Sequence, residues 1–260
     1  MKNGLTLSLL FFSFFSYAQI KLGIKGGYNL ASATVDTRNI AYTKDEFAPG
    51  YNVGIVGIYG LTKDFALKTE LLYASKGYGK RKYYNPGLFD RSDKTYSNYW
   101  QLQSQYLEIP VLLQYKTEGK KTRFFLDLGF YAAYWVRGVS SGSFFSNQLG
   151  EIYLKRWEIS ETYEFDNDYG LNRRKDNRFD LGLAGGLGFA YKLPKGEVFF
   201  EVRGDYGFLD LSSFQGSAPR TYSPQINRAI MFSLGYLITI KEAKPGKVKR
   251  EQEENEEEEE

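Results

Sequence analysis

One short motif in the sequence could carry nucleophilic chemistry. Gly138-Val139-Ser140-Ser141-Gly142 fits the G-x-S-x-G pattern, which in some hydrolases holds the catalytic serine at a sharp turn. Such a serine needs a base to take its proton, and the chain contains no His and no Cys. The same two absences exclude most zinc, haem and iron–sulfur centres and all cysteine nucleophiles. We interpret the motif as a chance match and expect no enzymatic activity, no cofactor and no metal site.

A second set of chemically active residues consists of acidic and basic side chains at alternate positions of otherwise apolar stretches. In an extended chain, alternate residues point to the same side, so these charges would gather on one face of a sheet. Charges enclosed in a narrow interior must pair, because desolvation costs several kcal/mol per ion. We predict an ion-pair network whose cations include Lys25, Lys68 and Arg203; it would be a structural plug or, alternatively, a gated proton or ion path. The predicted members are Lys25, Lys68, Glu70, Glu108, Asp127, Glu201, Arg203 and Asp205. Asp180 is expected inside the tube as well.

The third set is both basic and aromatic. Residues 77–103 contain five Lys or Arg against two Asp, interleaved with Tyr and Trp. Cations beside aromatic rings suit an anionic, ring-bearing surface such as lipopolysaccharide or another glycan. The alternative is a solvated hairpin whose rings continue an aromatic girdle. The binding candidates are Lys80, Arg81, Lys82, Tyr83, Tyr84, Arg91 and Trp100.

The elements that would position these residues are β-strands, because the apolar residues recur with period two. From Leu107 to Tyr115, for example, every second residue is Leu, Ile, Val or Tyr, and Glu108 lies on the opposite face. An aromatic content of 17% and 27 glycines agree with a β-rich protein. The pattern predicts eight strands, at about residues 20–30, 50–60, 65–76, 104–116, 123–135, 179–191, 197–208 and 227–240.

The connections between the predicted strands alternate in length. Residues 61–64, 117–122 and 192–196 are short, polar and rich in turn-forming residues, whereas the other connections are long. This arrangement is typical of bacterial outer-membrane barrels. We predict an all-β fold: an eight-stranded antiparallel up-and-down transmembrane β-barrel with short periplasmic turns and long extracellular loops. In the longest loop, residues 136–178, the alternating stretch 152–165 could extend the strands above the membrane.

Periodicity alone does not say which face points outward, and a secreted lipocalin-like barrel would place its apolar face inside. Side-chain volume favours the membrane barrel. One face is bulky and apolar at nearly every position, whereas the other is often small, as at Gly182, Gly186 and Gly188. The interior of an eight-stranded barrel has just enough room for side chains, so small residues fit inside. Tyrosines near the strand ends would form the interfacial girdle: Tyr28, Tyr51, Tyr59, Tyr73, Tyr115, Tyr134 and Tyr191.

Two terminal segments are expected to lie outside the barrel. Lys2, the apolar stretch 5–15 and the small residues before Gln19 indicate a signal peptide, residues 1–18, cleaved after Ala18. The barrel would then span residues 19–240. Residues 241–260 carry five basic and nine acidic residues and almost no apolar side chains, which predicts a disordered, charged periplasmic tail.

Two stretches resemble a known family. Leu22–Asn29, with the sequence LGIKGGYN, and Tyr106–Tyr115, with the sequence YLEIPVLLQY, are similar to the PorT-like outer-membrane β-barrel proteins of Bacteroidetes. The resemblance covers about residues 20–240 and implies a small barrel in the bacterial outer membrane; the name-giving member is needed for type IX secretion. Pro110 has no N–H, so we expect it at a bulge or a locally widened pair of strands, with Glu108 pointing inward toward a cation.

Three classes of function are consistent with the sequence. The first is a non-enzymatic outer-membrane barrel whose surface loops bind a partner or polysaccharide, as an accessory to type IX secretion. The second is a small porin, which would need a continuous water path. The third is an enzyme at the barrel rim, built from Lys, Asp or Glu. The expected partners are outer-membrane lipid, lipopolysaccharide and secretion-machinery proteins; the net charge of +3 gives no reason to expect nucleic acid.

Overall fold

The computed structural model describes residues 19–33, 43–84, 96–117, 119–146, 155–163, 177–211 and 225–241. The predicted signal peptide and, beyond Lys241, the predicted tail lie outside these residues. No helix in the described ranges is long and apolar enough to cross a membrane. The described strands are β1 (Ile20–Ala33), β2 (Thr43–Glu46), β3 (Ala48–Gly60), β4 (Phe65–Tyr84), β5 (Tyr96–Lys116), β6 (Thr122–Ser146), β7 (Lys155–Tyr163), β8 (Phe179–Leu193), β9 (Gly196–Gly207) and β10 (Asn227–Lys241).

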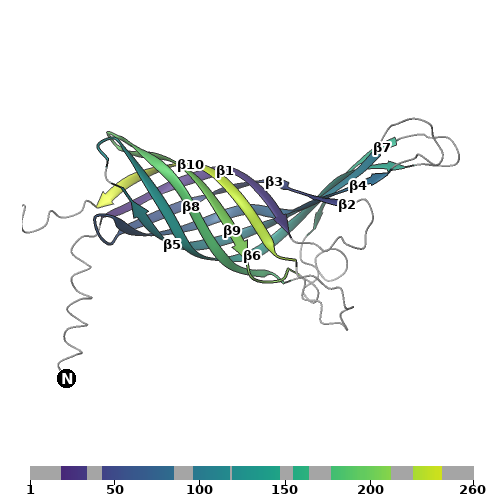
Figure 1. Cartoon of the computed structure of the whole chain (residues 1–260), viewed down its shortest axis with the longest axis horizontal. Helices are drawn as coiled ribbons and strands as arrows, with labels where there is room; N and C mark the ends of the chain where they lie inside the picture. The colour runs from purple at the N-terminus through teal and green to yellow at the C-terminus, as the bar shows by residue number, and fades with distance from the viewer. Residues whose placement is uncertain are drawn as a thin grey trace, which may run out of the picture.

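Eight of these strands close into an antiparallel barrel (Figure 1). Around the ring the order is β4, β3, β1, β10, β9, β8, β6 and β5, and β5 pairs back with β4. Because strands that follow one another in the ring are neighbours along the chain, and β1 pairs with β10, the topology is up-and-down. The eight predicted strands coincide with these eight elements, so the predicted eight-stranded fold is confirmed.

The alternation along each strand separates a bulky outer face from a polar or small inner face. In β6, Phe124, Leu126, Leu128 and Phe130 are all more than half exposed, whereas Asp127 between them is only 1% exposed. A continuous belt of exposed Leu, Ile, Val and Phe around a closed sheet would be unfavourable in water. It matches the lipid-facing surface of a membrane barrel.

The two ends of the barrel differ. At one end, three tight connections link β3 to β4, β5 to β6 and β8 to β9, and β1 begins and β10 ends there as well (Figure 1). We call this the turn end. In the β3–β4 turn, Thr62 Oγ1 accepts a hydrogen bond of 3.0 Å from the Phe65 N–H, and in the β5–β6 turn Thr117 Oγ1 accepts one of 3.0 Å from the Phe124 N–H. Thr62 and Thr117 therefore accept hydrogen bonds from backbone N–H groups beside these turns.

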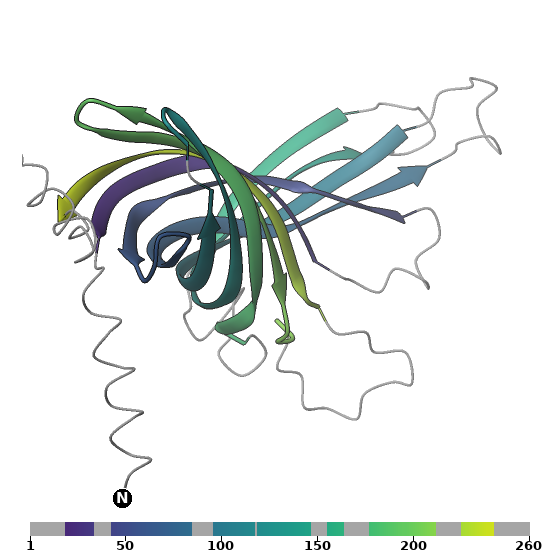
Figure 2. The ribbon, with the colours of Figure 1, turned by 60° about the vertical axis from the view of Figure 1, so that its left-hand side comes forward.

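At the opposite end, three strands continue past the barrel as an open sheet, which we call the fin (Figure 2). It consists of the outer parts of β4, β5 and β6, at residues 77–84, 96–104 and 137–146, with β2 on β4 and β7 on β6. Residues 77–84 and 96–103 are therefore paired strands rather than loop, which agrees with the hairpin alternative. The alternation of apolar residues, from which the strands were predicted, ends near residue 76. Backbone hydrogen bonds between strands do not require that alternation, so the strands continue beyond it. The prediction of an added strand within 152–165 is confirmed by β7.

Pro110 occupies the kind of position predicted for it. In the β4–β5 ladder, pairing runs as far as Thr69 opposite Val111 and resumes at Leu72 opposite Glu108. Between these pairs, at Pro110, the ladder is interrupted, because proline cannot donate a hydrogen bond. The Thr69 hydroxyl donates a 3.1 Å hydrogen bond to the Pro110 carbonyl instead.

Candidate functional site

The barrel interior consists of layers of side chains stacked along the barrel axis. Every second residue of each strand points inward, and successive inward residues contribute to successive layers. Along β6, the inward residues are Arg123 nearest the turn end, then Phe125, Asp127, and further on Tyr131 and Trp135. Along β9 the inward order is Glu197, Phe199, Glu201, Arg203 and Asp205. The lumen thus carries charges at the turn end, then an apolar layer, then a central group of charges, and finally an aromatic layer toward the fin.

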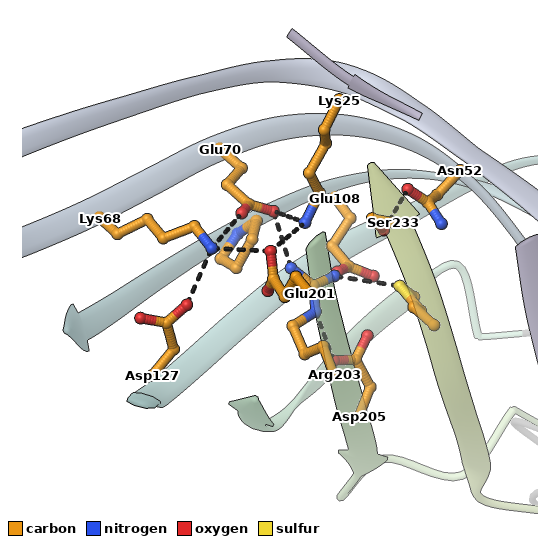
Figure 3. A network of polar contacts seen from close by, with 12 residues as sticks. Lys25, Asn52, Lys68, Glu70, Glu108, Asp127, Glu201, Arg203, Asp205 and Ser233 are labelled. Atoms are coloured by element: carbon orange, nitrogen blue, oxygen red, sulfur yellow. Dashed lines mark hydrogen bonds and ion pairs between the residues drawn. The ribbon is translucent and has the colours of Figure 1, made fainter. Parts of the chain in front are cut away.

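Arg203 is the hub of the central layer (Figure 3). Its guanidinium lies 2.7 Å from a carboxylate oxygen of Glu70, 2.7 Å from one of Glu108 and 3.1 Å from one of Asp205. The Arg203 side chain is 1% exposed. The planar guanidinium carries five N–H donors, so one side chain can bond several carboxylates at once.

Two lysines complete this part of the central layer. Lys68 Nζ lies 2.8 Å from Asp127, 2.8 Å from Glu201 and 3.2 Å from Glu70. Lys25 Nζ lies 2.7 Å from Glu70 and 3.3 Å from Glu201. The structure therefore brings all eight central candidates together, and Lys25, Lys68 and Arg203 are cations of one network, as the sequence suggests (Figure 3).

Sequence reasoning missed a fourth cation, Lys76. Its Nζ lies 2.6 Å from Glu108 and 3.1 Å from Asp205, and over the Tyr131 ring at 3.9 Å from the centroid. The signal was available, because Lys76 has the same parity along β4 as Lys68 and Glu70. With Lys76, Glu108 and Asp205 each have a second cation within 4 Å besides Arg203.

Asp180 belongs to the aromatic layer rather than to this network. Its carboxylate accepts hydrogen bonds from the Tyr131 hydroxyl at 3.1 Å and from the Asn227 amide at 3.0 Å. The same amide bonds the Tyr106 hydroxyl at 3.0 Å, and the Tyr106 ring stacks on Trp135 with centroids 6.0 Å apart. These rings close the lumen toward the fin.

On the other side of the network, Phe125 and Phe199 meet edge to face with centroids 6.4 Å apart. They lie in an apolar cluster with Val56, Ile58, Ala66, Ala190 and Leu237. The cavity beside this cluster measures about 10 Å³, which is about the smallest volume that holds one water molecule. The cluster therefore separates the central charges from the turn end.

The basic–aromatic candidates are divided between the two faces of the fin. Lys80 is paired with Trp100 across the sheet and Lys82 with Asn98, so both lysines share a face with Trp100. On this face Tyr78 meets Trp100 with centroids 5.6 Å apart, and Trp100 Nε1 donates a 2.6 Å hydrogen bond to Ser140 Oγ. Tyr78 also packs against the aromatic layer of the lumen. We call this the inner face of the fin.

Arg81 lies on the outer face. Its guanidinium makes two hydrogen bonds to Glu46 of β2, at 2.6 and 3.0 Å, and lies 5.1 Å from the centroid of the Tyr99 ring. These bonds hold the pKa of the Glu46 carboxyl below its usual range. On the inner face, partial burial lowers the pKa of Lys80, opposed by nearby Asp45. Tyr83 and Tyr84 end β4, and Arg91 lies outside the described residues. The candidates that the structure describes therefore do not share one face.

Comparison with known proteins agrees with this architecture. Residues 15–213 match the family described as outer membrane protein beta-barrel domain. The chain belongs to this family. The protein is thus a β-barrel of the bacterial outer membrane. Short turns face the periplasm and long connections face the cell exterior in such barrels, which assigns the turn end to the periplasmic side and the fin to the outside. No curated protein matches the chain.

Solved structures of other outer-membrane proteins are similar in fold. Neisserial surface protein A shares 12% identity, with 85% of this chain and 97% of that chain covered and a TM-score of 0.41. OprG of Pseudomonas aeruginosa shares 14% identity, with 86% and 94% covered and a TM-score of 0.39. The protease OmpT of Escherichia coli shares 10% identity, with 86% and 96% covered and a TM-score of 0.38.

The chemistry available to this barrel is electrostatic. Ser140, the central residue of the G-x-S-x-G string, lies within β6 and accepts the Trp100 hydrogen bond, so it is not at the strand-to-helix turn of a hydrolase nucleophile. In the described ranges no group of three or more acidic side chains is arranged to hold a metal ion. What the site offers is a closed, ion-paired lumen and a basic–aromatic surface above it.

Proposed function

We propose that the protein is a non-enzymatic, non-conducting outer-membrane barrel that binds an anionic polysaccharide, such as the glycan of lipopolysaccharide, on the inner face of its fin. The observation that carries this proposal is the Tyr78–Trp100 pair, flanked on the same face by Lys80 and Lys82. Aromatic faces stack on sugar rings, and ammonium groups pair with phosphate or carboxylate substituents.

The position of this face supports the proposal. Tyr78 and Leu102 rest on the buried aromatic layer that closes the lumen, so the rings are held by a rigid base. Trp100 is further fixed by its bond to Ser140. A ligand would therefore meet a preorganised surface, and less of its binding energy would be spent on ordering side chains.

Binding of lipopolysaccharide-derived core oligosaccharide to the protein in nanodiscs tests the proposal. We expect Trp100→Ala to weaken binding about tenfold, as loss of a central aromatic contact does. Lys80→Gln and Lys82→Gln should weaken binding of the phosphorylated oligosaccharide but not of its dephosphorylated form. Lys44→Gln is the matched control, because Lys44 opposes Arg81 and lies on the outer face. Unchanged affinity in Trp100→Ala would overturn the proposal.

A role as an accessory to type IX secretion is a second proposal. It is supported by the similarity of Leu22–Asn29 in β1 and Tyr106–Tyr115 in β5 to PorT-like proteins. Deletion of the gene should then remove a class of proteins from the culture supernatant, and the full-length gene should restore them. An unchanged set of secreted proteins would overturn this role without affecting the glycan proposal.

A further inference from the structure

The periplasmic turn end contains an open basic chamber that neither the fold nor the fin explains. One part has a volume of about 550 Å³ and a second part, which shares several lining residues, about 430 Å³. We call the two parts together the vestibule. The apolar layer at Phe125 and Phe199 closes its inner end, so it is a blind chamber rather than a channel entrance.

Most of the charged residues that line the vestibule are basic. All three periplasmic turns contribute lysines, at Lys63, Lys120 and Lys195, and the strand ends add four more cations: Lys21, Lys116, Arg123 and Lys192. Glu197 is the only carboxylate among the described lining residues. Low-dielectric walls around like charges focus their field, so such a chamber attracts anions.

The floor of the vestibule holds more positive charge than its one carboxylate balances. Lys21 Nζ lies 2.6 Å from one oxygen of Glu197, and the Arg123 guanidinium bonds the other. Arg123 is 7% exposed, and among the described residues its Nε–H has no hydrogen-bond partner. Buried donors are nearly always satisfied, and an unsatisfied one costs about 1–3 kcal/mol. This orphaned donor on the floor is a second indication that an anionic acceptor belongs there.

We propose that the vestibule binds the acidic stretch of the same chain, Glu251–Glu260. This stretch contains eight Glu and no basic residue. β10 ends at Lys241 beside the vestibule, which Thr239 helps to line. The nine intervening residues can extend to roughly 30 Å, enough to turn back into the chamber. The intervening residues include four Lys or Arg, so their charge has the same sign as most of the lining. Only the acidic stretch is opposite to the lining in charge.

Distance measurements on the full-length protein test the proposal. Because the chain contains no Cys, Asn255→Cys and Pro194→Cys introduce two unique sites for nitroxide labels, one in the acidic stretch and one at the vestibule rim. In nanodiscs of neutral lipid we expect a distinct short-distance population in a pulsed electron paramagnetic resonance experiment. It should disappear at about 1 M salt, where the screening length falls to about 3 Å.

Substitutions decide whether the vestibule is the binding site. Lys120→Gln, Lys192→Gln and Lys195→Gln combined should abolish the short-distance population; these three lysines are exposed, so the buried pairs stay intact. The pair Lys44→Gln and Lys82→Gln, on the fin, is the control and should leave it unchanged. Dilution with unlabelled protein should also leave it unchanged, since the contact is within one chain.

Three results would overturn the proposal: a broad distance distribution that salt does not alter, a short-distance population that survives the triple substitution, or one that dilution removes. The last would show that the acidic stretch enters a neighbouring molecule. None of these outcomes bears on glycan binding at the fin, which lies at the other end of the barrel.

Discussion

β4, β5 and β6 run through two regions of the molecule, the barrel and the fin. Their charged residues are buried in the barrel and partly exposed in the fin. Inside the barrel, charged residues of these strands such as Lys68, Glu108 and Asp127 are at most 1% exposed, and each lies within 4 Å of an opposite charge. In the fin, the Arg81 and Glu46 side chains are 33% and 27% exposed and form a bidentate pair. A closed sheet has an inside where charge must be compensated, whereas an open sheet keeps both faces near water. The same strands can therefore seal a lumen and present a surface.

The largest expected effect is a difference in unfolding free energy between a substitution in the barrel and one in the fin. Arg203→Met removes one cation from three buried carboxylates, so we expect a loss of about 3–5 kcal/mol in unfolding free energy. Arg81→Met, which breaks the fin pair, should cost no more than about 1 kcal/mol. Urea unfolding in lipid bilayers, followed by Trp fluorescence and by gel mobility with and without heating, measures both. Equal losses in the two variants would show that burial does not distinguish the regions.

A smaller effect is expected where a glycine makes room for the apolar layer. A Cβ at Gly188 would overlap the Phe125 ring and the Phe200 carbonyl, whereas at Gly185, three residues earlier in β8, its nearest neighbour is a Leu128 methyl at 3.6 Å. We expect Gly188→Ala to cost about 1–3 kcal/mol, as overpacking does, and Gly185→Ala to cost much less. The same unfolding assay compares them. A larger loss in Gly185→Ala would contradict this packing of the lumen.

The smallest effect concerns the pH dependence of the fin. Because Arg81 holds the pKa of Glu46 below its unfolded value, the pair stabilises the β2–β4 contact fully above that unfolded value. This stabilisation is lost as the pH falls from about 4.3, the ordinary Glu pKa, through the lower folded pKa. The protection factors of the β2 and β4 amides, which correct for the slowing of intrinsic exchange in acid, should therefore fall over this pH range. Glu46→Gln should remove this pH dependence; if it persists, another group is responsible.

The sequence was sufficient for the ring of strands and for most of the central charges. Period-two alternation places Lys68, Glu70 and Asp127 on one face whatever the exact register, because a closed barrel leaves only one inside. Lys76 follows the same parity and could have been included. Once bulky residues were assigned to the lipid, the inward face of an eight-stranded tube had to hold these charges.

The way the aromatic residues fit inside the lumen could not be predicted from parity. Phe125 shares the parity of Asp127 and Phe199 that of Glu201, but only the register shows that Gly188 lies opposite Phe125 and that Gly235 lies opposite Phe199. Those glycines open the space that the rings fill. The fin escaped prediction for a different reason: residues 77–84 and 96–104 pair through their backbones without an apolar face, so no periodicity marks them as strands.

Single-channel recording of the full-length protein in planar bilayers tests the closed lumen most directly. The apolar layer at Phe125 and Phe199 leaves a cavity of only about 10 Å³ between the vestibule and the central ion pairs, so we predict no unit openings at any applied voltage that the bilayer tolerates. Reconstitution is checked in the same preparation by the heat-dependent gel mobility of the folded barrel. Stable, reproducible openings from folded protein would contradict a sealed barrel and would favour the small porin instead.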